Sequence, residues 1–238
     1  YSNMVSKIDF LSGKNVLIFD TETTGLPYRV PGAKWGSTSE YWPYQMNEKY
    51  NSSRIVSIAW AFVVNFDKTI LDCISIKHYI RYPEGFNEIP TSHIHGITFD
   101  NAINNGIPLN DILDNCGLMD AIVNADYIIA HNVMFDVNIL LNELWRLQTE
   151  NSNECIKAIQ NLLAFKKCIC SGEMGRDLCK IEYKNRKHPG NDGRNGGSGN
   201  YKMPKLVEMY KFFYGCEFEG QHNADGDVRA LMRCLSKM

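Results

Sequence analysis

The sequence lacks a hydrophobic run long enough to cross a membrane, and it lacks a strong excess of either charge. Its 238 residues include no apolar stretch of about 18 residues, and the N-terminus has no basic segment followed by an apolar one, as secretion signals have. The formal net charge is only −2, so a global electric field does not attract a polyanion. From these absences we expect a soluble, cytoplasmic protein without a membrane partner.

The cysteines form neither a disulfide framework nor a short zinc-knuckle pattern. Eight of them are scattered along the chain, and several lie in apolar surroundings where a reduced thiol packs as a small hydrophobic group. This usage favours an intracellular, reducing compartment. Cys168, Cys170, Cys179 and His188 are of the types that bind zinc. A zinc-dependent binding module built on these cysteines therefore stays an alternative.

The length and composition predict one globular domain over residues 1–238. A content of 44% hydrophobic and 22% charged residues provides a sizeable core. Residues 1–3 precede Met4, and we interpret them as a remnant of cloning. The segment 27–51 is an aromatic-rich insertion whose rings either form a lid that stacks on bases or fold back onto the core. The segment 185–200 contains five glycines, and we expect a flexible loop there.

One segment departs from the nearly neutral charge of the whole chain. Between Lys166 and Lys205, ten basic residues stand against four acidic ones, which is a local excess of six. Such a segment is typical of a phosphate-binding flank, although an ordinary solvated loop has the same composition. The charges alone leave both interpretations open.

The hydrophobic pattern predicts an α/β sheet flanked by helices. Buried strands are expected at residues 16–19 and 126–130, and an antiparallel hairpin at 54–64 and 69–80. Apolar residues at helical spacing predict helices over 109–124, 132–147, 153–165, 204–214 and 224–235. Helix, strand and helix in succession after a hairpin are typical of a sheet with helices on its faces.

Three segments supply carboxylates and a histidine near the ends of these predicted elements. Asp20 and Glu22 lie two residues apart on a strand, so they project from the same face. Asp136 falls in the second turn of a predicted helix, and His222 and Asp227 lie at the start of the last one. Taken singly, each segment is better explained as a solvated strand end, a helix cap or a surface histidine. Only their combination indicates a site.

The order and spacing of these segments are similar to those of a known family. The motifs are D-x-E at residues 20–22, H-N-x-x-F-D at 131–136 and H-x-A-x-x-D at 222–227. Supporting matches lie at residues 19–25, 57–60, 95–98 and 130–132. Over about residues 14–236, the sequence resembles the DEDDh branch of the DnaQ-like 3′→5′ exonucleases. That family includes the proofreading epsilon subunit of bacterial replicative polymerase, RNase T and TREX-type enzymes.

The resemblance implies a ribonuclease H-like fold with a mixed five-stranded sheet, and two divalent metal ions, Mg²⁺ or Mn²⁺. Asp20 would bridge both ions, Glu22 and Asp227 would complete the site of the ion that activates water, and Asp136 would hold the other ion. Oxygen ligands suit Mg²⁺ or Mn²⁺ better than zinc. His222 would be the general base for the attacking water, because an imidazole accepts a proton near neutral pH.

The resemblance also implies a pocket for the last nucleotide of the substrate. Backbone amides in the turn after the first strand would meet the sugar, and Leu26 would wedge against the base. His95 is either a further contact or a histidine in an ordinary turn. The substrate-binding residues implied in this way are Thr23, Thr24, Gly25, Leu26, His95, Asn132 and Phe135.

The resulting hypothesis is a metal-dependent 3′→5′ exonuclease that releases nucleoside monophosphates from single-stranded or frayed 3′ ends, with DNA favoured over RNA. An RNA-trimming 3′→5′ exoribonuclease is the alternative within the same class. A non-catalytic nucleic-acid-binding factor that assists a polymerase is the alternative from another class. Because no polymerase domain lies within these residues, proofreading would require a polymerase in trans.

Overall fold

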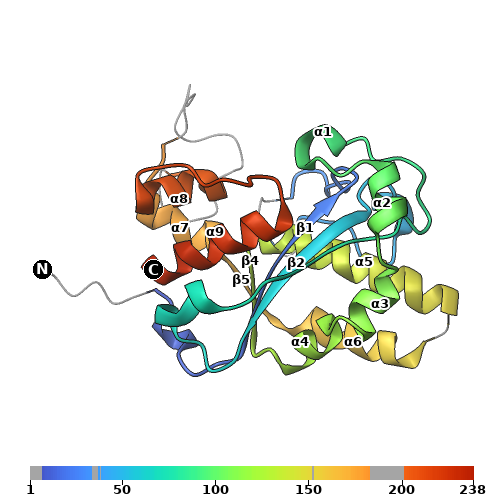
Figure 1. The fold of residues 1–238 in the computed structure, drawn as a ribbon, viewed down its shortest axis with the longest axis horizontal. Coiled ribbons are helices and arrows are strands. Elements are labelled where there is room, and N and C mark those ends of the chain that lie inside the picture. Colours follow the sequence, from blue (N-terminus) through green and yellow to red (C-terminus); the bar gives the residue numbers. More distant parts are fainter. Residues whose placement is uncertain (1–6, 34–36, 38, 152, 183–200) are drawn as a thin grey trace, which may run out of the picture.

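A mixed five-stranded sheet forms the centre of the molecule (Figure 1). It is seen in a computed structural model that describes residues 7–33, 37, 39–151, 153–182 and 201–238. The strands are β1 (Val16–Thr23), β2 (Ile55–Val63), β3 (Lys77–Ile80), β4 (Tyr127–Ala130) and β5 (Lys167–Cys170). Their order is β3-β2-β1-β4-β5, and β1 pairs antiparallel with β2 and parallel with β4. The predicted α/β class with a five-stranded mixed sheet is confirmed.

Helices cover both faces of this sheet. Helix α9 (Ala224–Lys237) lies across one face, and α5 (Val133–Asn151) and α6 (Glu154–Phe165) lie on the other. Further α-helices are α1 (Ser92–His95), α2 (Phe99–Asn105), α3 (Leu109–Asp114), α4 (Leu118–Asn124), α7 (Ser171–Cys179) and α8 (Leu206–Tyr214). Short 3₁₀ helices are η1 (Asp9–Leu11), η2 (Asn47–Lys49) and η3 (Lys68–Cys73). In the described part of the chain, no helix combines the length and apolar character needed to cross a membrane.

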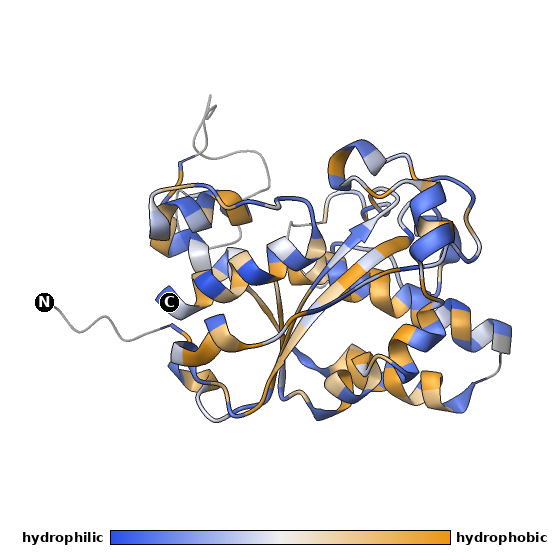
Figure 2. Cartoon of the chain, in the orientation of Figure 1, coloured by the Kyte–Doolittle hydropathy of each residue, from blue (hydrophilic) through white to orange (hydrophobic). Residues whose placement is uncertain are grey.

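Alternation along β1 divides the core into two layers. Val16 and Ile18 pack on the side of α9, whereas Leu17 and Phe19 pack on the side of α5. A strand that is buried on both faces needs consecutive apolar residues, which is the pattern that predicted it. The flanking helices are amphipathic, with hydrophobic and hydrophilic sides (Figure 2). Asp20 is the next residue of β1 on the α9 side, so it lies at the edge of the core, where the apolar part of the strand ends.

Two predicted elements differ from the structure. The expected strand at 69–80 is wrong in its first half, where the chain forms η3. The Asp67 side chain accepts hydrogen bonds from the backbone N–H and the hydroxyl of Thr69, both at 2.8 Å, and so starts this helical turn. The expected helix over 109–124 is interrupted between α3 and α4, because Gly117 adopts a φ of +84°. The short elements α1, α2, β5 and α7 were not predicted, since four to nine residues show no clear period.

The described part of the aromatic-rich insertion folds back along α5. Tyr50 is fully buried, and Tyr44 packs against the core. Asn142 of α5 donates a hydrogen bond to the backbone carbonyl of Tyr44 at 2.7 Å. Tyr28 is an exception, because 61% of it is exposed. These contacts favour the interpretation that most of the described rings pack on the core.

The structure separates the cysteines that a zinc site would need. Cys168 and Cys170 of β5 pack on the α5 side of the sheet, whereas Cys179 packs on the α9 side. His188 and the predicted loop at 185–200 lie outside the described residues. The zinc-binding alternative therefore gains no support from the described part of the chain.

The basic segment between Lys166 and Lys205 is engaged mainly within the protein, as far as it is described. Lys166 donates hydrogen bonds to the carbonyls of Val123 (3.0 Å) and Ala125. Arg176 pairs with Glu173 at 2.5 Å, and Lys202 pairs with Glu208 at 2.6 Å. These pairings favour a structural interpretation of the described basic residues over a phosphate-binding flank.

Candidate active site

Three carboxylates meet at the end of β1, where the apolar part of the strand stops. Asp20 and Glu22 project from the face of the sheet that α9 covers, and Asp227 reaches them from the first turn of α9. One oxygen atom from each side chain lies within 4.8 Å of those from the other two. The fold thus brings together three of the four carboxylates that the sequence singles out.

The start of α9 determines where Asp227 lies. The Asn223 side chain caps the helix by accepting a hydrogen bond from a first-turn backbone N–H at 3.1 Å. Gly226 lies so close to the preceding loop that a Cβ atom on it would be 2.3 Å from the carbonyl oxygen of Gly220. The cap and this close approach hold the first turn of α9 against the loop that carries His222.

Asp136 approaches the cluster from α5, on the other side of the sheet. Parallel pairing of β1 with β4 ends at Ile18 and Ile129, so β1 continues beyond its neighbour. Beyond that point the buried Asp136 side chain replaces β4 as the hydrogen-bond partner of β1. It accepts hydrogen bonds from the backbone N–H (3.1 Å) and the hydroxyl (2.7 Å) of Thr21. This role of Thr21 is absent from the sequence prediction, since it depends on where β4 ends relative to β1.

Burial raises the pKa of all four carboxyl groups. The pKa of Asp20 lies well above its usual range because of burial and, to a lesser extent, the charges of the other three. Burial likewise raises the pKa of Glu22 to about 8, and those of Asp136 and Asp227 to about 7. The hydrogen bonds from Thr21 act against this rise in the pKa of Asp136. Near neutral pH the cluster therefore favours bound protons or bound cations.

The donor set fits a divalent cation of the hard type. Carboxylate oxygens are the ligands that Mg²⁺ and Mn²⁺ prefer, and all members of the three-residue group are carboxylates. A cation at this point would also remove the repulsion that contributes to the raised pKa of Asp20. Asp20, Glu22 and Asp227 would be its direct ligands, with Asp136 as a further acidic group beside them.

Of the two predicted histidines, His222 adjoins the cluster through a backbone hydrogen bond to Asp227, and His95 lies near His222. His222 is exposed and adopts a left-handed backbone with a φ of +60°. In His95, Nδ1 accepts a hydrogen bond from the backbone N–H of Ile97 (3.1 Å), and Nε2 lies 3.0 Å from the hydroxyl of Thr91. Burial lowers the pKa of His95, and the charge of the nearby His222 contributes to this effect. Both ring nitrogens of His95 are thus used within the protein, which suits a turn histidine.

The turn predicted to hold the last nucleotide follows β1 and is tied to its surroundings by its carbonyl groups. The hydroxyls of Thr23 and Ser53 both donate to the carbonyl of Gly25 at 2.7 Å. The hydroxyl of Thr91 donates to the carbonyl of Thr23 at 2.5 Å. The Leu26 side chain is 77% exposed. Ser53 and Thr91 are not in the predicted set, because nothing in their local sequence marks them.

Asn132 and Phe135 lie at the start of α5, next to Asp136. Asn132 has a left-handed φ of +71°, and its carbonyl accepts a hydrogen bond from the backbone N–H of Phe135 at 2.9 Å. The Asn132 side chain also hydrogen-bonds to the hydroxyl of Tyr41 in the insertion. Phe135 is half-buried against the core. The start of α5 is therefore supported by the insertion.

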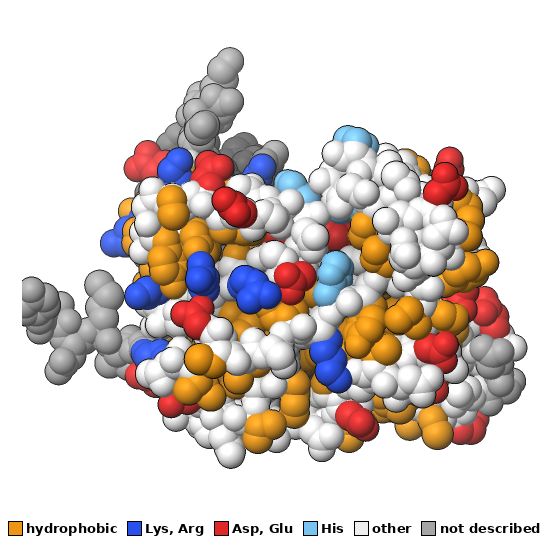
Figure 3. Space-filling model, viewed as in Figure 1, with side chains coloured by type: hydrophobic (Ala, Val, Ile, Leu, Met, Phe, Trp, Pro, Cys, Tyr) orange, Lys and Arg blue, Asp and Glu red, His pale blue; other side chains and the backbone are white. Residues whose placement is uncertain are grey.

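Charges of both signs alternate on the face of the molecule that Figure 3 shows. On α9, Arg229 pairs with Asp225 at 3.4 Å, and Arg233 pairs with Asp72 at 3.3 Å. This distribution agrees with the net charge of −2. Recognition of a charged ligand would therefore depend on local contacts at the site rather than on a broad field.

The chain has a ribonuclease H-like fold, which it shares with solved exonuclease structures. It is similar to the zinc-bound complex of E. coli exonuclease I with single-stranded DNA, with a TM-score of 0.57 and 14% identity over 95% of this chain and 41% of that one. For E. coli exonuclease I with a dT13 oligonucleotide, the TM-score is 0.57 and the sequence identity is 15%, and the match covers 94% of this chain and 40% of that one. For exonuclease I from Methylocaldum szegediense, the TM-score is 0.54 and the sequence identity is 16%, and the match covers 94% of this chain and 40% of that one.

This chain thus spans about two fifths of the exonuclease I chains that it matches. No family model matches the sequence, and no curated protein matches it either. Likeness at this level of identity defines the fold, and function has to be argued from the site.

Proposed function

We propose that this protein is a divalent-metal-dependent 3′→5′ exonuclease that releases nucleoside monophosphates from nucleic-acid 3′ ends. The observation that carries the proposal is the half-buried cluster of Asp20, Glu22 and Asp227 with the buried Asp136 beside it, because the raised pKa values of these groups favour bound cations. The order of the three sequence motifs and the fold shared with exonuclease I support the same activity. Two ions, Mg²⁺ or Mn²⁺, would balance up to four carboxylate charges.

The proposed roles follow from the position of each group. Bound divalent ions would supply charge stabilisation to the attacking and leaving oxygens of a phosphodiester. His222 would accept the proton of the attacking water, because its side chain is exposed and its backbone hydrogen-bonds to Asp227 of the cluster. The turn at 23–26 would hold the terminal nucleotide, with the exposed Leu26 against its base. Asn132 and Phe135 would line the opposite wall at the start of α5.

Single-stranded DNA is the substrate that we propose to be preferred. The exonuclease I structures with this fold are complexes with single-stranded DNA or a dT13 oligonucleotide. RNA trimming is the alternative substrate, because discrimination by the 2′-hydroxyl depends on contacts in the bound state. A non-catalytic factor that assists a polymerase is the alternative of another class, and the assembled carboxylate cluster argues against it. That alternative would include a polymerase as a partner in trans.

A gel time course tests the proposal. The wild type is incubated with matched 5′-labelled single-stranded DNA and RNA in Mg²⁺ or Mn²⁺, with EDTA as a control. We expect a descending ladder that requires metal and that runs faster on DNA. Asp20→Ala should cut the rate below about one hundredth of the wild-type value. Asp225→Ala is the matched control, because Asp225 lies in the same first turn of α9 as Asp227 but outside the cluster.

The outcomes separate the alternatives. A faster ladder on RNA would favour the exoribonuclease. Folded wild-type protein that produces no ladder on either substrate would overturn the exonuclease proposal and favour the binding factor. Equal activity of Asp20→Ala and Asp225→Ala would show that the cluster does not carry the reaction.

A further inference from the structure

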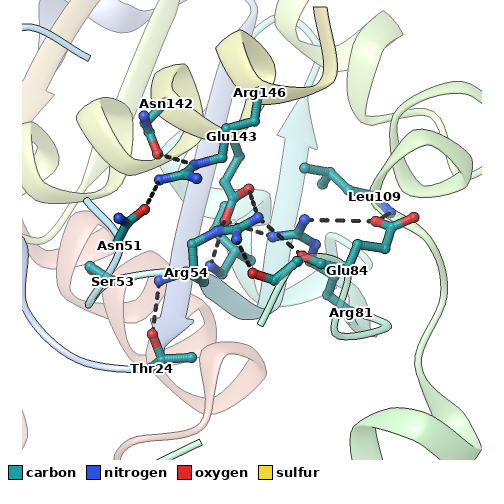
Figure 4. A network of polar contacts seen from close by, with 12 residues as sticks. Thr24, Asn51, Ser53, Arg54, Arg81, Glu84, Leu109, Asn142, Glu143 and Arg146 are labelled. Carbon is teal, nitrogen blue, oxygen red and sulfur yellow. Dashed lines mark hydrogen bonds and ion pairs between the residues drawn. The ribbon is translucent and has the colours of Figure 1, made fainter. Parts of the chain in front are cut away.

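A second network of charged side chains is buried beneath the turn at 23–26. Its centre is Glu143 in the middle of α5, which is fully buried (Figure 4). The Glu143 carboxylate accepts hydrogen bonds from Arg54 Nε (2.9 Å) and Nη2 (3.0 Å). Arg81 Nη1 lies 2.6 Å from the same carboxylate, and the backbone N–H of Ile55 donates to it at 3.0 Å. One carboxylate therefore joins β2, the end of β3 and α5.

This network holds its shape because its charges are paired and shielded. The positive charges of Arg81 and Arg54 lower the pKa of Glu143 to about 2 in spite of its burial. The ring of Phe86 lies 5.4 Å from the Arg54 guanidinium and 5.6 Å from that of Arg81. Arg54 also donates to the carbonyls of Glu84 (3.1 Å) and Gly85 (3.0 Å). The planar guanidinium of Arg54 thus has fixed partners on two sides.

The main chain of Arg54 connects this network to the turn. Its backbone N–H donates to the hydroxyl of Thr24, and its carbonyl accepts from the backbone N–H of Thr24, both at 2.9 Å. The two preceding residues continue the contact. Ser53 donates to the carbonyl of Gly25 at 2.7 Å, and Ser52 donates to the carbonyl of Leu26 at 2.8 Å.

The close approach of the two segments explains the glycine in the turn. A Cβ atom on Gly25 would lie 2.7 Å from the carbonyl oxygen of Ser52, which is shorter than any normal contact. Residues 52–54 therefore pack directly against the turn, and hydrogen bonds join them to residues 24, 25 and 26.

We propose that Arg54 is a positioning residue for substrate: through its ion pair with Glu143 it fixes residues 24–26 relative to Asp136, and so sets the affinity for the terminal nucleotide. Glu143 and Asp136 lie seven residues apart on α5, which is about two helical turns, so the same rigid helix carries both. This inference rests on the proposed function of the turn. The network itself holds no group that touches the phosphodiester.

Arg54→Lys is the variant that tests this role, and Arg81→Lys is its matched control. Both substitutions weaken a buried pairing with Glu143 and keep the charge. The difference is that Arg54 hydrogen-bonds to the turn through Thr24, whereas the hydrogen bonds of Arg81 are to other segments. We expect Arg54→Lys to raise KM at least ~10-fold with kcat changed less than about threefold, and Arg81→Lys to leave KM within about threefold at matched stability.

Hydrogen exchange of the Thr24 backbone amide provides a readout that does not depend on activity. Because this amide donates to the Arg54 carbonyl, its exchange should speed up at least ~10-fold in Arg54→Lys and stay near the wild-type rate in Arg81→Lys. If Arg54→Lys fails to fold, Ser53→Ala replaces it, since this milder change removes only the bond to Gly25 and should also raise KM.

Equal KM effects in Arg54→Lys and Arg81→Lys, or an unchanged KM in both Arg54→Lys and Ser53→Ala, would overturn the proposal. So would unchanged exchange at Thr24 in Arg54→Lys. A wild type without nuclease activity would instead refute the proposed function, and exchange at Thr24 would still show whether Arg54 holds the turn.

Discussion

Asp136 combines two tasks in one side chain. On the edge of β1 that extends beyond β4, it accepts two hydrogen bonds from Thr21, and it adds a negative charge beside Asp20. Removing its carboxylate would leave a buried N–H and a buried hydroxyl without their acceptor, at a cost of about 1–3 kcal/mol each. Asp136→Asn is therefore a better test of this residue than Asp136→Ala, because asparagine keeps an acceptor oxygen at this position.

The backbone of His222 is left-handed, which limits the substitutions that can test its catalytic role. Alanine at a φ of +60° would add backbone strain, whereas asparagine tolerates this conformation. We expect His222→Asn to lower kcat at least ~100-fold, the usual contribution of a general base, with little change in KM. Single-turnover kinetics on 5′-labelled DNA measure this effect. His93→Asn is the control, because His93 is an exposed histidine of α1, and equal rates for the two variants would rule out the role of His222.

At the scale of whole elements, α9 positions the site through its first turn. Replacing a glycine inside a helix by alanine normally stabilises the helix by about 0.5–1 kcal/mol. Here the added Cβ atom would lie 2.3 Å from the Gly220 carbonyl, so the loop before α9 must move. We expect Gly226→Ala to lower both the melting temperature and kcat, the latter at least ~10-fold. Thermal unfolding and the nuclease assay measure the two effects.

The control for this change is Gly13→Ala. Gly13 has a φ of +72° and nothing within 4 Å of an added Cβ atom, so its substitution strains the backbone far from the site. It should cost about 1–2 kcal/mol of stability and leave kcat unchanged. A Gly226→Ala protein that is fully active and more stable than wild type would show that the loop adapts without moving His222.

The elements that the sequence predicted best are those with a clear hydrophobic period. Helices α5 and α6 and the buried strands β1 and β4 appear where their apolar residues indicated. Strand β5 was not predicted because its four residues are one lysine, two cysteines and a single isoleucine rather than a β-branched run. The carboxylates were found from short motifs, but the partners that hold them were not. Thr21 and Arg54 act through strand register and long-range pairing, which local sequence does not encode.

For the whole molecule, the four carboxyl groups of the cluster make stability depend on pH. Their pKa values in the folded protein are raised by burial, whereas in the unfolded chain they return to about 4. Between about pH 4 and pH 8 the folded state therefore binds more protons than the unfolded state. The free energy of unfolding must fall as pH rises through this window, because folding then requires charges to be buried close together.

Thermal unfolding at several pH values, with and without Mg²⁺, tests this linkage and the metal site together. In EDTA, the melting temperature should fall by at least ~5 °C between pH 5 and pH 8.5. Mg²⁺ binds the ionised carboxylates of the folded state, so it should raise the melting temperature more at pH 8.5 than at pH 5. A double variant, Asp20→Asn with Glu22→Gln, removes two of the raised pKa values and should reduce both effects. A melting temperature with the same pH dependence in the wild type and this variant would place the linkage elsewhere in the protein.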